Sequence, residues 1–545
     1  MGFRPLVVLL GLGVLAAACG APAAPAGQTQ SQKSPPKYGG TLNLASVTDP
    51  FDYDLTLNGI SAPNPDYFFM SLYSLVSFRA APEVAFADEV MEPSLAESWE
   101  INKDATVYTF HLRKGVRFSD LPPVNGREFT SKDVKFTYEY YSRSGEFKDK
   151  KPASPVAWTY EGIQTIETPD AYTAVVKFSE PRASFRGITA ANRWSAIVPR
   201  EIYDRDGDFK NALAGTGPYV IDQAASQKGS RWVYKKNPKY FQPERPYIDE
   251  VRWLILADDS ATRAVFQTRQ VDMFGYGTSG FTVEQADSIK ASNPNAVAYK
   301  FNAPAPLQLM FNTKKQPLDD LRVRKAMALA INRDEYLQVF GKGQGQWALT
   351  PALLGAFSEQ EIKQIIKYDP EEARRLLVES GHAGGVNLEF MYTAERGGRY
   401  MKEMELLISQ LKKANINLTA KGTDKASDTR RKITGDYEIS LVPSARTAGD
   451  VMDWAVAHFL PGSSSNFNQL DDLRVTAMLK AGESEPDLKK RTEIVRQIAR
   501  YAYDNVLAIS IYHGVDHAFW HPYVKNFTPN FWTRGVPIVN TWLEK

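Results

Sequence analysis

Three histidines near the C-terminus have the spacing that most readily suggests chemistry. His513, His517 and His521 follow one another at intervals of four residues, which on a helix would place all three on one face as metal ligands. Residues 506–512, just before them, read instead as a strand, and a nearby glycine and proline disfavour a helix. On a strand, four residues span about 13 Å, which is too far for one ion. We therefore predict no metal site in this segment.

Other motifs of known chemistry are incomplete in this chain. It contains no Gly-x-Ser-x-Gly nucleophile turn, no His-Glu-x-x-His zinc helix and no phosphate loop of the Walker type. Residues 341–345 are rich in glycine but lack the strand, turn and helix that would place amides around a phosphate, so we predict a loop. Residues 204–208 alternate aspartates as a calcium loop does, but the stretch is too short and has no closing glutamate, which indicates a turn. We expect no catalytic residues, no metal and no cofactor.

The only cysteine, Cys19, follows a short apolar segment at the start of the chain. Arg4 gives this segment a positive beginning, and residues 5–18 are apolar but too short to span a bilayer, as in secretory signals. Residues 15–20, Leu-Ala-Ala-Ala-Cys-Gly, resemble a bacterial lipobox, whose cysteine becomes the diacylated N-terminus, although an alanine stands where the usual large aliphatic residue lies. The alternative is an ordinary secretory signal cut near an Ala-x-Ala site, with the cysteine discarded. We predict a lipoprotein signal peptide over residues 1–19 and lipid attachment at Cys19.

The rest of the chain has the composition of a large folded body on a tether. Residues 20–37 contain almost no bulky apolar side chain, which predicts a flexible tether. Beyond them no run is long and apolar enough for a transmembrane helix. The body has no cysteine, so a large hydrophobic core, drawn from 43% hydrophobic residues, must hold it in an oxidising compartment. The charges of the whole chain are interspersed and nearly balanced, at +2, which argues against a nucleic-acid partner.

Strand-like and helix-like segments alternate through the body. The strand-like segments are residues 40–45, 108–112, 171–178, 307–312, 386–392, 437–442 and 506–512. The helix-like segments are residues 66–78, 131–141, 320–331, 370–379, 400–414 and 488–503. The alternation in the second half predicts an α/β lobe with a mostly parallel sheet. The aromatic content, 12% with ten Trp, suits both a core and a cleft that grips a ligand.

Longer patterns, in a fixed order, resemble one family. They are residues 93–100 (Pro-Ser-Leu-Ala-Glu-Ser-Trp-Glu), 108–118, 129–134, 215–219 (Gly-Thr-Gly-Pro-Tyr), 237–240 (Asn-Pro-Lys-Tyr), 249–251, 311–313, 321–326 (Leu-Arg-Val-Arg-Lys-Ala) and 369–373. Together they resemble the signature of the family 5 solute-binding proteins, the oligopeptide, dipeptide and nickel-type receptors of ABC importers. The resemblance covers about residues 38 to 530.

This resemblance implies an α/β, two-lobed fold like that of periplasmic binding proteins. An extra domain is inserted in the first lobe, and a ligand cleft lies between the lobes. The implied boundaries are residues 38–80, 210–305 and 506–545 for the first lobe, 81–209 for the inserted domain and 306–505 for the second lobe. The implied function is that of a receptor without catalytic activity, which closes on its ligand about a hinge and is then recognised by a membrane permease.

One stretch departs from the peptide-binding members of the family. After the strand at 437–442, those members share a Gly-Trp-x-x-Asp-type stretch, whose aspartate is implied to hold the α-amino group of the ligand. Here Thr447 takes that place, and Asp450 or Asp453 could serve only after a shift of register. We predict a peptide-like ligand, with an oligosaccharide as the alternative, because stacking aromatics would serve a sugar without an aspartate. The predicted ligand-binding residues are Arg446, Asp450, Trp454, Trp194, Gln308 and Phe51.

Two further classes stay open. A tethered surface hydrolase would bring a nucleophile, a base and an orienting group together in the cleft. A receptor that feeds a sensor or helps proteins to fold would have the same sequence features as an importer's receptor. In the preferred interpretation the protein is extracytoplasmic, monomeric and lipid-anchored to the cell membrane. Its partners are then a small ligand and the permease subunits.

Overall fold

The computed structural model describes most of the chain beyond the predicted tether. The described residues are 35–46, 49, 53–54, 70–84, 90–150, 157–190, 195–256, 258–275, 280–303, 306–349, 357–393, 398–443, 450–463, 465–530 and 536–545. Residues Lys37–Lys545 form one unit. The predicted signal peptide and most of the predicted tether lie outside the described residues. Within the part that is described, no helix combines the length and the apolar character needed to cross a membrane.

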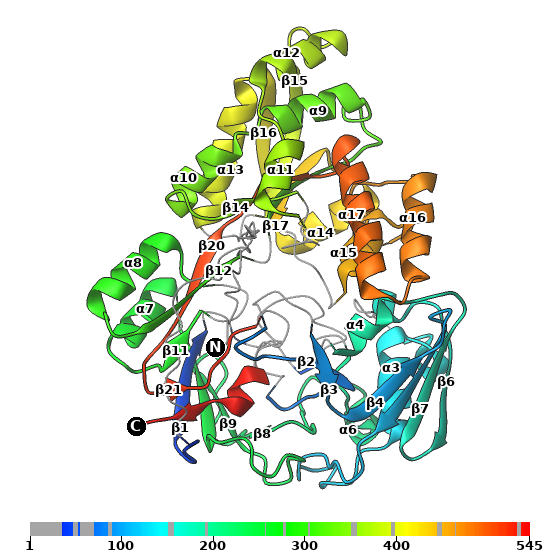
Figure 1. Ribbon diagram of the computed structural model, residues 1–545, viewed down its shortest axis with the longest axis vertical. Coiled ribbons are helices and arrows are strands. Elements are labelled where there is room, and N and C mark those ends of the chain that lie inside the picture. Colours follow the sequence, from blue (N-terminus) through cyan, green and yellow to red (C-terminus); the bar gives the residue numbers. More distant parts are fainter. Residues whose placement is uncertain are drawn as a thin grey trace, which may run out of the picture. The chain divides into compact units, whose positions relative to one another are not determined.

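A seven-stranded sheet gathers strands from both ends of the chain (Figure 1). Its order is β12 (Val297–Asn302), β20 (Val515–Trp520), β11 (Met273–Phe274), β1 (Thr41–Ser46), β10 (Glu250–Ile255), β9 (Arg231–Lys236) and β8 (Tyr219–Ile221). Strand β1 is parallel to β10 and β11, and the other pairings are antiparallel. Alternate residues of β1, such as Leu42 and Leu44, are buried in the core. Helices α7 (Asp259–Gln267) and α8 (Val283–Ser292) lie beside this sheet.

A second, four-stranded antiparallel sheet is built from the region predicted as an inserted domain. Its order is β4 (Ala96–Ile101), β5 (Val107–Leu112), β7 (Thr173–Phe178) and β6 (Ile163–Asp170). The predicted strand over 108–112 is confirmed, and its alternate residues Tyr108, Phe110 and Leu112 are buried. The predicted helix over 131–141 is also confirmed as α3 (Ser131–Ser142), which Thr130 caps.

Shorter elements complete this region and correct one prediction. They are β2 (Val76–Phe78), β3 (Met91–Pro93), η1 (Gly145–Phe147), η2 (Ala157–Tyr160), α4 (Phe185–Ala190) and α6 (Arg200–Asp206). Strands β2 and β3 pair in antiparallel fashion. The helix expected over 66–78 is therefore wrong at its C-terminal end, because β2 finds in β3 a partner that the local spacing of apolar residues does not reveal.

The third sheet has five strands, in the order β16 (Ile416–Thr423), β15 (Val386–Thr393), β17 (Ile439–Pro443), β13 (Leu307–Phe311) and β18 (Ile509–Ser510). Strand β15 is parallel to β16 and β17, whereas β13 is antiparallel to β17 and β18. The sheet is therefore mixed rather than mostly parallel. The reason is that the chain enters it through β13 at the edge where β17 ends, since Leu307 lies opposite Pro443.

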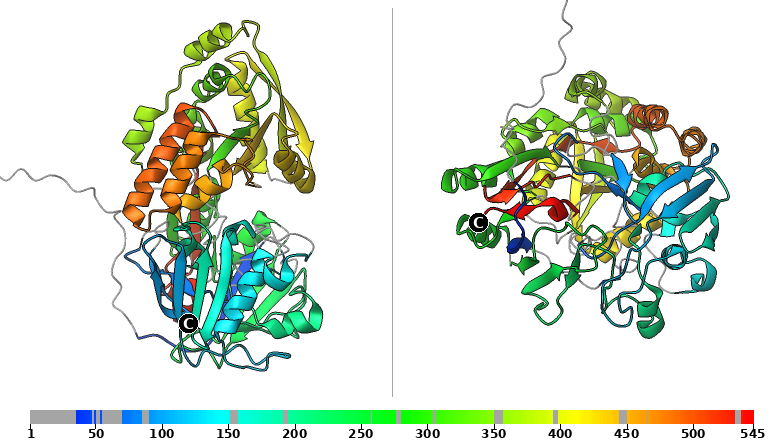
Figure 2. Two further views of the ribbon diagram at one scale, coloured as in Figure 1. Left: turned by 90° about the vertical axis from the view of Figure 1, so that its right-hand side faces the viewer. Right: turned by 60° about the horizontal axis from the view of Figure 1, so that its bottom comes forward.

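Two groups of helices accompany this sheet. The first shares a core with one face of the strands and comprises α9 (Leu321–Leu329), α10 (Arg333–Gly341), α12 (Pro370–Glu379) and α13 (Gly398–Lys412). The second forms its own core from α11 (Glu359–Ile365), α15 (Val451–Phe459), α16 (Leu473–Glu483) and α17 (Leu488–Asp504). Figures 1 and 2 show α15, α16 and α17 side by side. Helix α14 (Lys425–Thr434) follows β16.

The end of the second predicted lobe needs correction. The sequence predicts that the first lobe resumes at residue 506, but β18 pairs with β13 in the five-stranded sheet. The next strand, β19 (Tyr512–His513), pairs with β14 (Gln346–Trp347), and the chain rejoins the seven-stranded sheet only at β20. The chain ends with β21 (Val524–Lys525), η4 (Val536–Asn540) and β22 (Trp542–Leu543). The other predicted boundaries stay predictions.

Candidate functional site

Two sheets present the ends of their parallel strands to the segments that join them. In the five-stranded sheet β15 ends at Thr393 and β17 at Pro443, on the edge where β13 begins. In the seven-stranded sheet β1 ends at Ser46 and β11 at Phe274. Open α/β sheets bind ligands outside the carboxyl ends of their strands. These edges, with the joining segments, are therefore the candidate ligand site.

The chain crosses between the two sheets twice, once from β12 to β13 and once from β18 through β19 to β20. The two crossing segments are hydrogen bonded to each other: Ala303 N donates to Gly514 O at 2.7 Å, and Ile511 N donates to Leu307 O at 2.8 Å. His513 bonds through Nδ1 to Ala303 O at 2.9 Å. Burial lowers the pKa of His513 to about 4, so its ring is neutral at pH 7. The crossing is thus a short ladder of neutral hydrogen bonds.

The three C-terminal histidines have separate surroundings. His513 lies on β19 and His517 on β20, while His521 follows β20 and bonds through Nε2 to Phe266 O at 3.2 Å. Burial also lowers the pKa of His517 to about 4. Across the described ranges, no three His, Cys, Asp or Glu side chains gather closely enough to hold a metal ion.

A charged cluster links the two sheets beside this ladder. Arg399 of α13 donates to Glu403 at 3.0 Å and to the hydroxyl of Tyr512 at 3.2 Å, and its guanidinium lies 3.6 Å from the Asp516 carboxylate on β20. Burial opposes the charge on Arg399, but Tyr512, Glu403 and Asp516 outweigh it and raise its pKa. Burial raises the pKa of Asp516 to about 6, although Arg399 acts in the opposite direction. One guanidinium thus serves two buried carboxylates.

This cluster fits against a glycine on the crossing. A Cβ added to Gly514 would lie 2.3 Å from Nη2 of Arg399, so a side chain there would displace the guanidinium. These residues were not predicted from the sequence, although two signals exist. Arg399 and Glu403 stand four apart near the predicted helix over 400–414, and Asp516 interrupts an apolar strand.

One face of the five-stranded sheet carries buried polar groups near the same edge. The side chains of Gln308, Ser440 and Ser510 are 1%, 0% and 4% exposed. Gln308 Oε1 and both serine hydroxyls have no hydrogen-bond partner among the described residues. Gln308 belongs to the predicted ligand-binding set, whereas neither serine was singled out.

Two other predicted residues, Asp450 and Trp454, have roles inside the helical group. Asp450 caps α15, accepting from Met452 N at 3.0 Å, and its carboxylate accepts from Arg491 Nε at 3.1 Å. Both members of this ion pair are fully buried. Trp454 is buried in the core that α15 shares with α16 and α17. Both side chains are buried, and their part in ligand binding stays a prediction.

The remaining predicted residues are not in the described part of the chain. Phe51, Trp194 and Arg446 lie outside the described residues, and so does Cys19.

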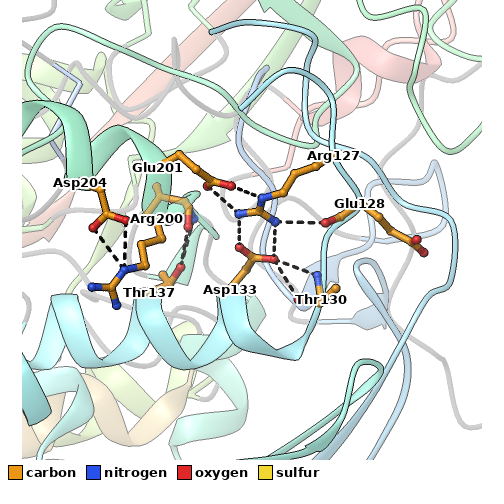
Figure 3. Close-up of polar contacts among 9 residues, drawn as sticks. Arg127, Glu128, Thr130, Asp133, Thr137, Arg200, Glu201 and Asp204 are labelled. Atoms are coloured by element: carbon orange, nitrogen blue, oxygen red, sulfur yellow. Dashed lines mark hydrogen bonds and ion pairs between the residues drawn. The ribbon is translucent and has the colours of Figure 1, made fainter. Parts of the chain in front are cut away.

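A dense ion network in the four-stranded region tests the hydrolase alternative (Figure 3). Arg127 donates to both Asp133 oxygens, at 2.7 and 2.9 Å, to Glu201 through two bonds, and to the Glu128 carbonyl at 3.0 Å. Burial opposes the charge on Arg127, but its bonds to Glu201 and Asp133 raise its pKa. The bond from Arg127 lowers the pKa of Glu201. Because every N–H of the guanidinium has an acceptor, this network joins α3 to α6 rather than binding a substrate.

Three cavities are lined by other residues. A cavity of about 430 Å³ lies between η2 and β6 on one side and the end of α15 on the other. Another, of about 510 Å³, borders the Arg127 network, and a third, of about 890 Å³, is a groove along α11, α16 and α17. None of these three is lined by the crossing segments or by Gln308, Ser440 and Ser510.

Similarity to solved structures defines the class of fold. The periplasmic binding protein DppA from Helicobacter pylori, described as ABC transporter-associated and in complex with the peptide STSA, superimposes with a TM-score of 0.78 at 22% identity, covering 93% of this chain and 99% of that one. The binding protein AgaA from A. tumefaciens R10, in complex with agropinic acid, gives a TM-score of 0.77 at 23% identity, covering 93% and 99%. The fold is therefore the two-lobed α/β fold of periplasmic binding proteins, with a domain inserted in the first lobe.

The sequence comparisons define the family. The chain is 25% identical over 513 residues to Di/tripeptide-binding protein 1 of Pseudomonas aeruginosa (strain UCBPP-PA14), covering 88% of this chain and 92% of that protein. The model of the bacterial extracellular solute-binding proteins, family 5 (middle region) matches residues 90–466. The chain belongs to this family, whose members are extracytoplasmic substrate-binding receptors rather than enzymes.

Proposed function

We propose that this protein is the receptor of an ABC importer, which captures a peptide-like ligand and delivers it to a membrane permease. The family match over residues 90–466, together with a relative named for di- and tripeptide binding, is the observation that supports this most directly. The ligand would bind at the two sheet edges beside the crossing segments. Closure about those segments would then distinguish the loaded form for the permease.

The sequence near the site leaves an oligosaccharide as a second candidate ligand. Thr447 takes the place of the family's amine-binding aspartate, and the carboxylate of Asp450 is already paired with Arg491. A peptide would therefore need another partner for its ammonium group, because a buried charge must be paired. An oligosaccharide needs no such partner. The structural relative AgaA is in complex with agropinic acid, so a small ligand other than a di- or tripeptide is found on this fold. A peptide is our first candidate and an oligosaccharide the second.

The proposal includes three finer points. The receptor has no catalytic activity of its own, it acts as a monomer, and its N-terminus is tethered to the membrane by a lipid on Cys19. The lipobox-like residues 15–20 support the tether. Mass spectrometry of the membrane fraction checks it: a diacyl adduct on wild type that is lost in Cys19→Ser supports the anchor, and equal release of both into the soluble fraction contradicts it.

The ligand class is tested by native mass spectrometry and thermal unfolding of the purified full chain. We expect a co-purified peptide, or a rise in the melting temperature with a mixture of di- and tripeptides. A ligand at 100 times its Kd adds about 2.7 kcal/mol to the free energy of unfolding. A rise with oligosaccharides and none with peptides would replace the peptide by the second candidate. Steady turnover of either probe would overturn the non-catalytic receptor.

A further inference from the structure

The three unpartnered polar groups of the five-stranded sheet lie together on one face. Gln308 on β13 is directly opposite Ser510 on β18, and Ser440 on β17 is opposite Met310, two residues along β13. Directly opposite side chains are about 5 Å apart at Cβ, and diagonal ones about 7–8 Å. Gln308 therefore lies within reach of a group that also contacts either serine, while Ser440 and Ser510, on the two strands that flank β13, are too far apart to bind the same small group.

The opposite face of the same strands is apolar. Leu309, Phe311 and Ile509 point to that face and pack against the first helical group. A buried polar atom without a partner destabilises the folded state, and native structures keep few of them. Others, such as the Tyr138 and Tyr219 hydroxyls, occur elsewhere among the described residues, but these three lie on neighbouring strands of one face.

A second buried glutamine, Gln410, has hydrogen-bond partners at both ends of its side-chain amide. Gln410 on α13 is 2% exposed, as buried as Gln308. Its Oε1 accepts from Asn332 N at 3.0 Å, and its Nε2 donates to Asn332 O at 3.1 Å and to Glu335 at 2.7 Å. The fold thus satisfies both ends of one buried glutamine and leaves the acceptor of the other open.

The donor and acceptor character of the three side chains indicates which ligand groups can bind to them. Gln308 Oε1 is an acceptor, and the serine hydroxyls can donate and accept. The charged side chain that bonds to this segment, Arg333, is directed at the main chain, where it donates to Ser510 O at 3.0 Å. No carboxylate is among the three, so a ligand ammonium placed here would be buried without a counter-charge. An uncharged amide or hydroxyl would complete the bonds.

We propose that Gln308, together with Ser440 on one side and Ser510 on the other, forms a neutral subsite that binds uncharged amide or hydroxyl groups of the ligand. The subsite rests on the proposed receptor function and on its position at the edge where β13 begins. A peptide would supply a backbone or side-chain amide, and an oligosaccharide a hydroxyl. In either case the donor on the ligand reaches Gln308 Oε1.

The test compares Gln308→Leu with the matched control Gln410→Leu, both in the full chain. Calorimetric titration uses a pool of tripeptides and, separately, maltotriose. We expect Gln308→Leu to weaken binding of the active probe by about tenfold or more, since about 1.4 kcal/mol corresponds to tenfold, and Gln410→Leu to leave it unchanged. Ser510→Ala should weaken binding by a smaller factor. The probe that responds tells whether the ligand group is an amide or a hydroxyl.

Melting temperatures without ligand give a second, independent readout. Gln308→Leu should melt no lower than wild type, because it removes an unsatisfied group, whereas Gln410→Leu should melt several degrees lower. Binding unchanged in Gln308→Leu, or an equal loss of melting temperature in the two variants, would overturn the subsite and leave the receptor standing. Binding of neither probe by wild type would overturn the receptor as proposed and the subsite with it.

Discussion

Two polar regions of this molecule differ in whether all of their polar atoms have hydrogen-bond partners. The Arg127 network gives every guanidinium N–H an acceptor, and its partners Asp133, Glu128 and Glu201 belong to the same four-stranded region (Figure 3). The face with Gln308 and Ser440 leaves three polar atoms without partners. A closed network stabilises the fold and has no bonds left for a ligand. An open one costs stability and has bonds left for a ligand.

The closed network should show the largest loss when it is broken. Arg127→Met leaves Asp133, which is 3% exposed at its side chain, without its cation. Because the Arg127 side chain is itself 33% exposed, the loss in the free energy of unfolding should be about 2–3 kcal/mol, below that of a fully buried pair, as measured by urea denaturation. Arg127→Lys keeps the charge but cannot make the paired bonds, so it should lose an intermediate amount. Ligand affinity should not change.

The control for this variant is an exposed arginine with two carboxylate neighbours. Arg375 on α12 pairs with Glu372 and Glu379 at the surface. Arg375→Met should be indistinguishable from wild type, because solvent screens such pairs. If Arg127→Met were as stable as Arg375→Met, closure of the network would contribute nothing and the comparison would fail.

The Arg399 cluster lies between the two extremes, because its single guanidinium serves two carboxylates. Burial raises the pKa of Asp516 from its ordinary value of 3.8 to about 6. The folded protein therefore holds this proton more tightly than the unfolded chain, and the stability gained from it is present below about pH 4 and lost as the pH rises through 6. Relative to the neutral variant Asp516→Asn, wild type should lose on the order of 2 kcal/mol between pH 4 and pH 7.

The difference between the two proteins, measured by unfolding at each pH, isolates Asp516 from the histidines. His513 and His517 have lowered pKa values and act in the opposite sense, but they are present in both proteins. At pH 7 Asp516→Asn should be the more stable protein. A less stable variant at pH 7 would mean that attraction to Arg399 outweighs burial and that the cluster is closed like the Arg127 network.

The sequence predicts the local elements of both regions better than their partners. The alternation at 108–112 and the Thr130 cap give β5 and α3 directly, and Asp320 caps α9 as expected, accepting from Arg322 N at 2.7 Å. The pairing of β18 with β13 joins residues about two hundred positions apart, and no local pattern encodes it. Ser440 and Ser510 lie beside Gln308 only because of long-range strand pairing, so the sequence alone did not single them out.

The smallest expected effect concerns the glycine against which the Arg399 cluster packs. In Gly514→Ala the new Cβ would lie 2.3 Å from Nη2 of Arg399, so the guanidinium must move away from Tyr512. Because the obstacle is the flexible end of a side chain, we expect a loss of about 1 kcal/mol in the free energy of unfolding, measured by urea denaturation. Gly341→Ala, at the end of α10 with nothing within 4 Å of its Cβ position, is the control and should be neutral or slightly stabilising. If Gly514→Ala matched Gly341→Ala, the guanidinium would have another position of equal energy. The crossing would then be held by its ladder of hydrogen bonds rather than by this cluster.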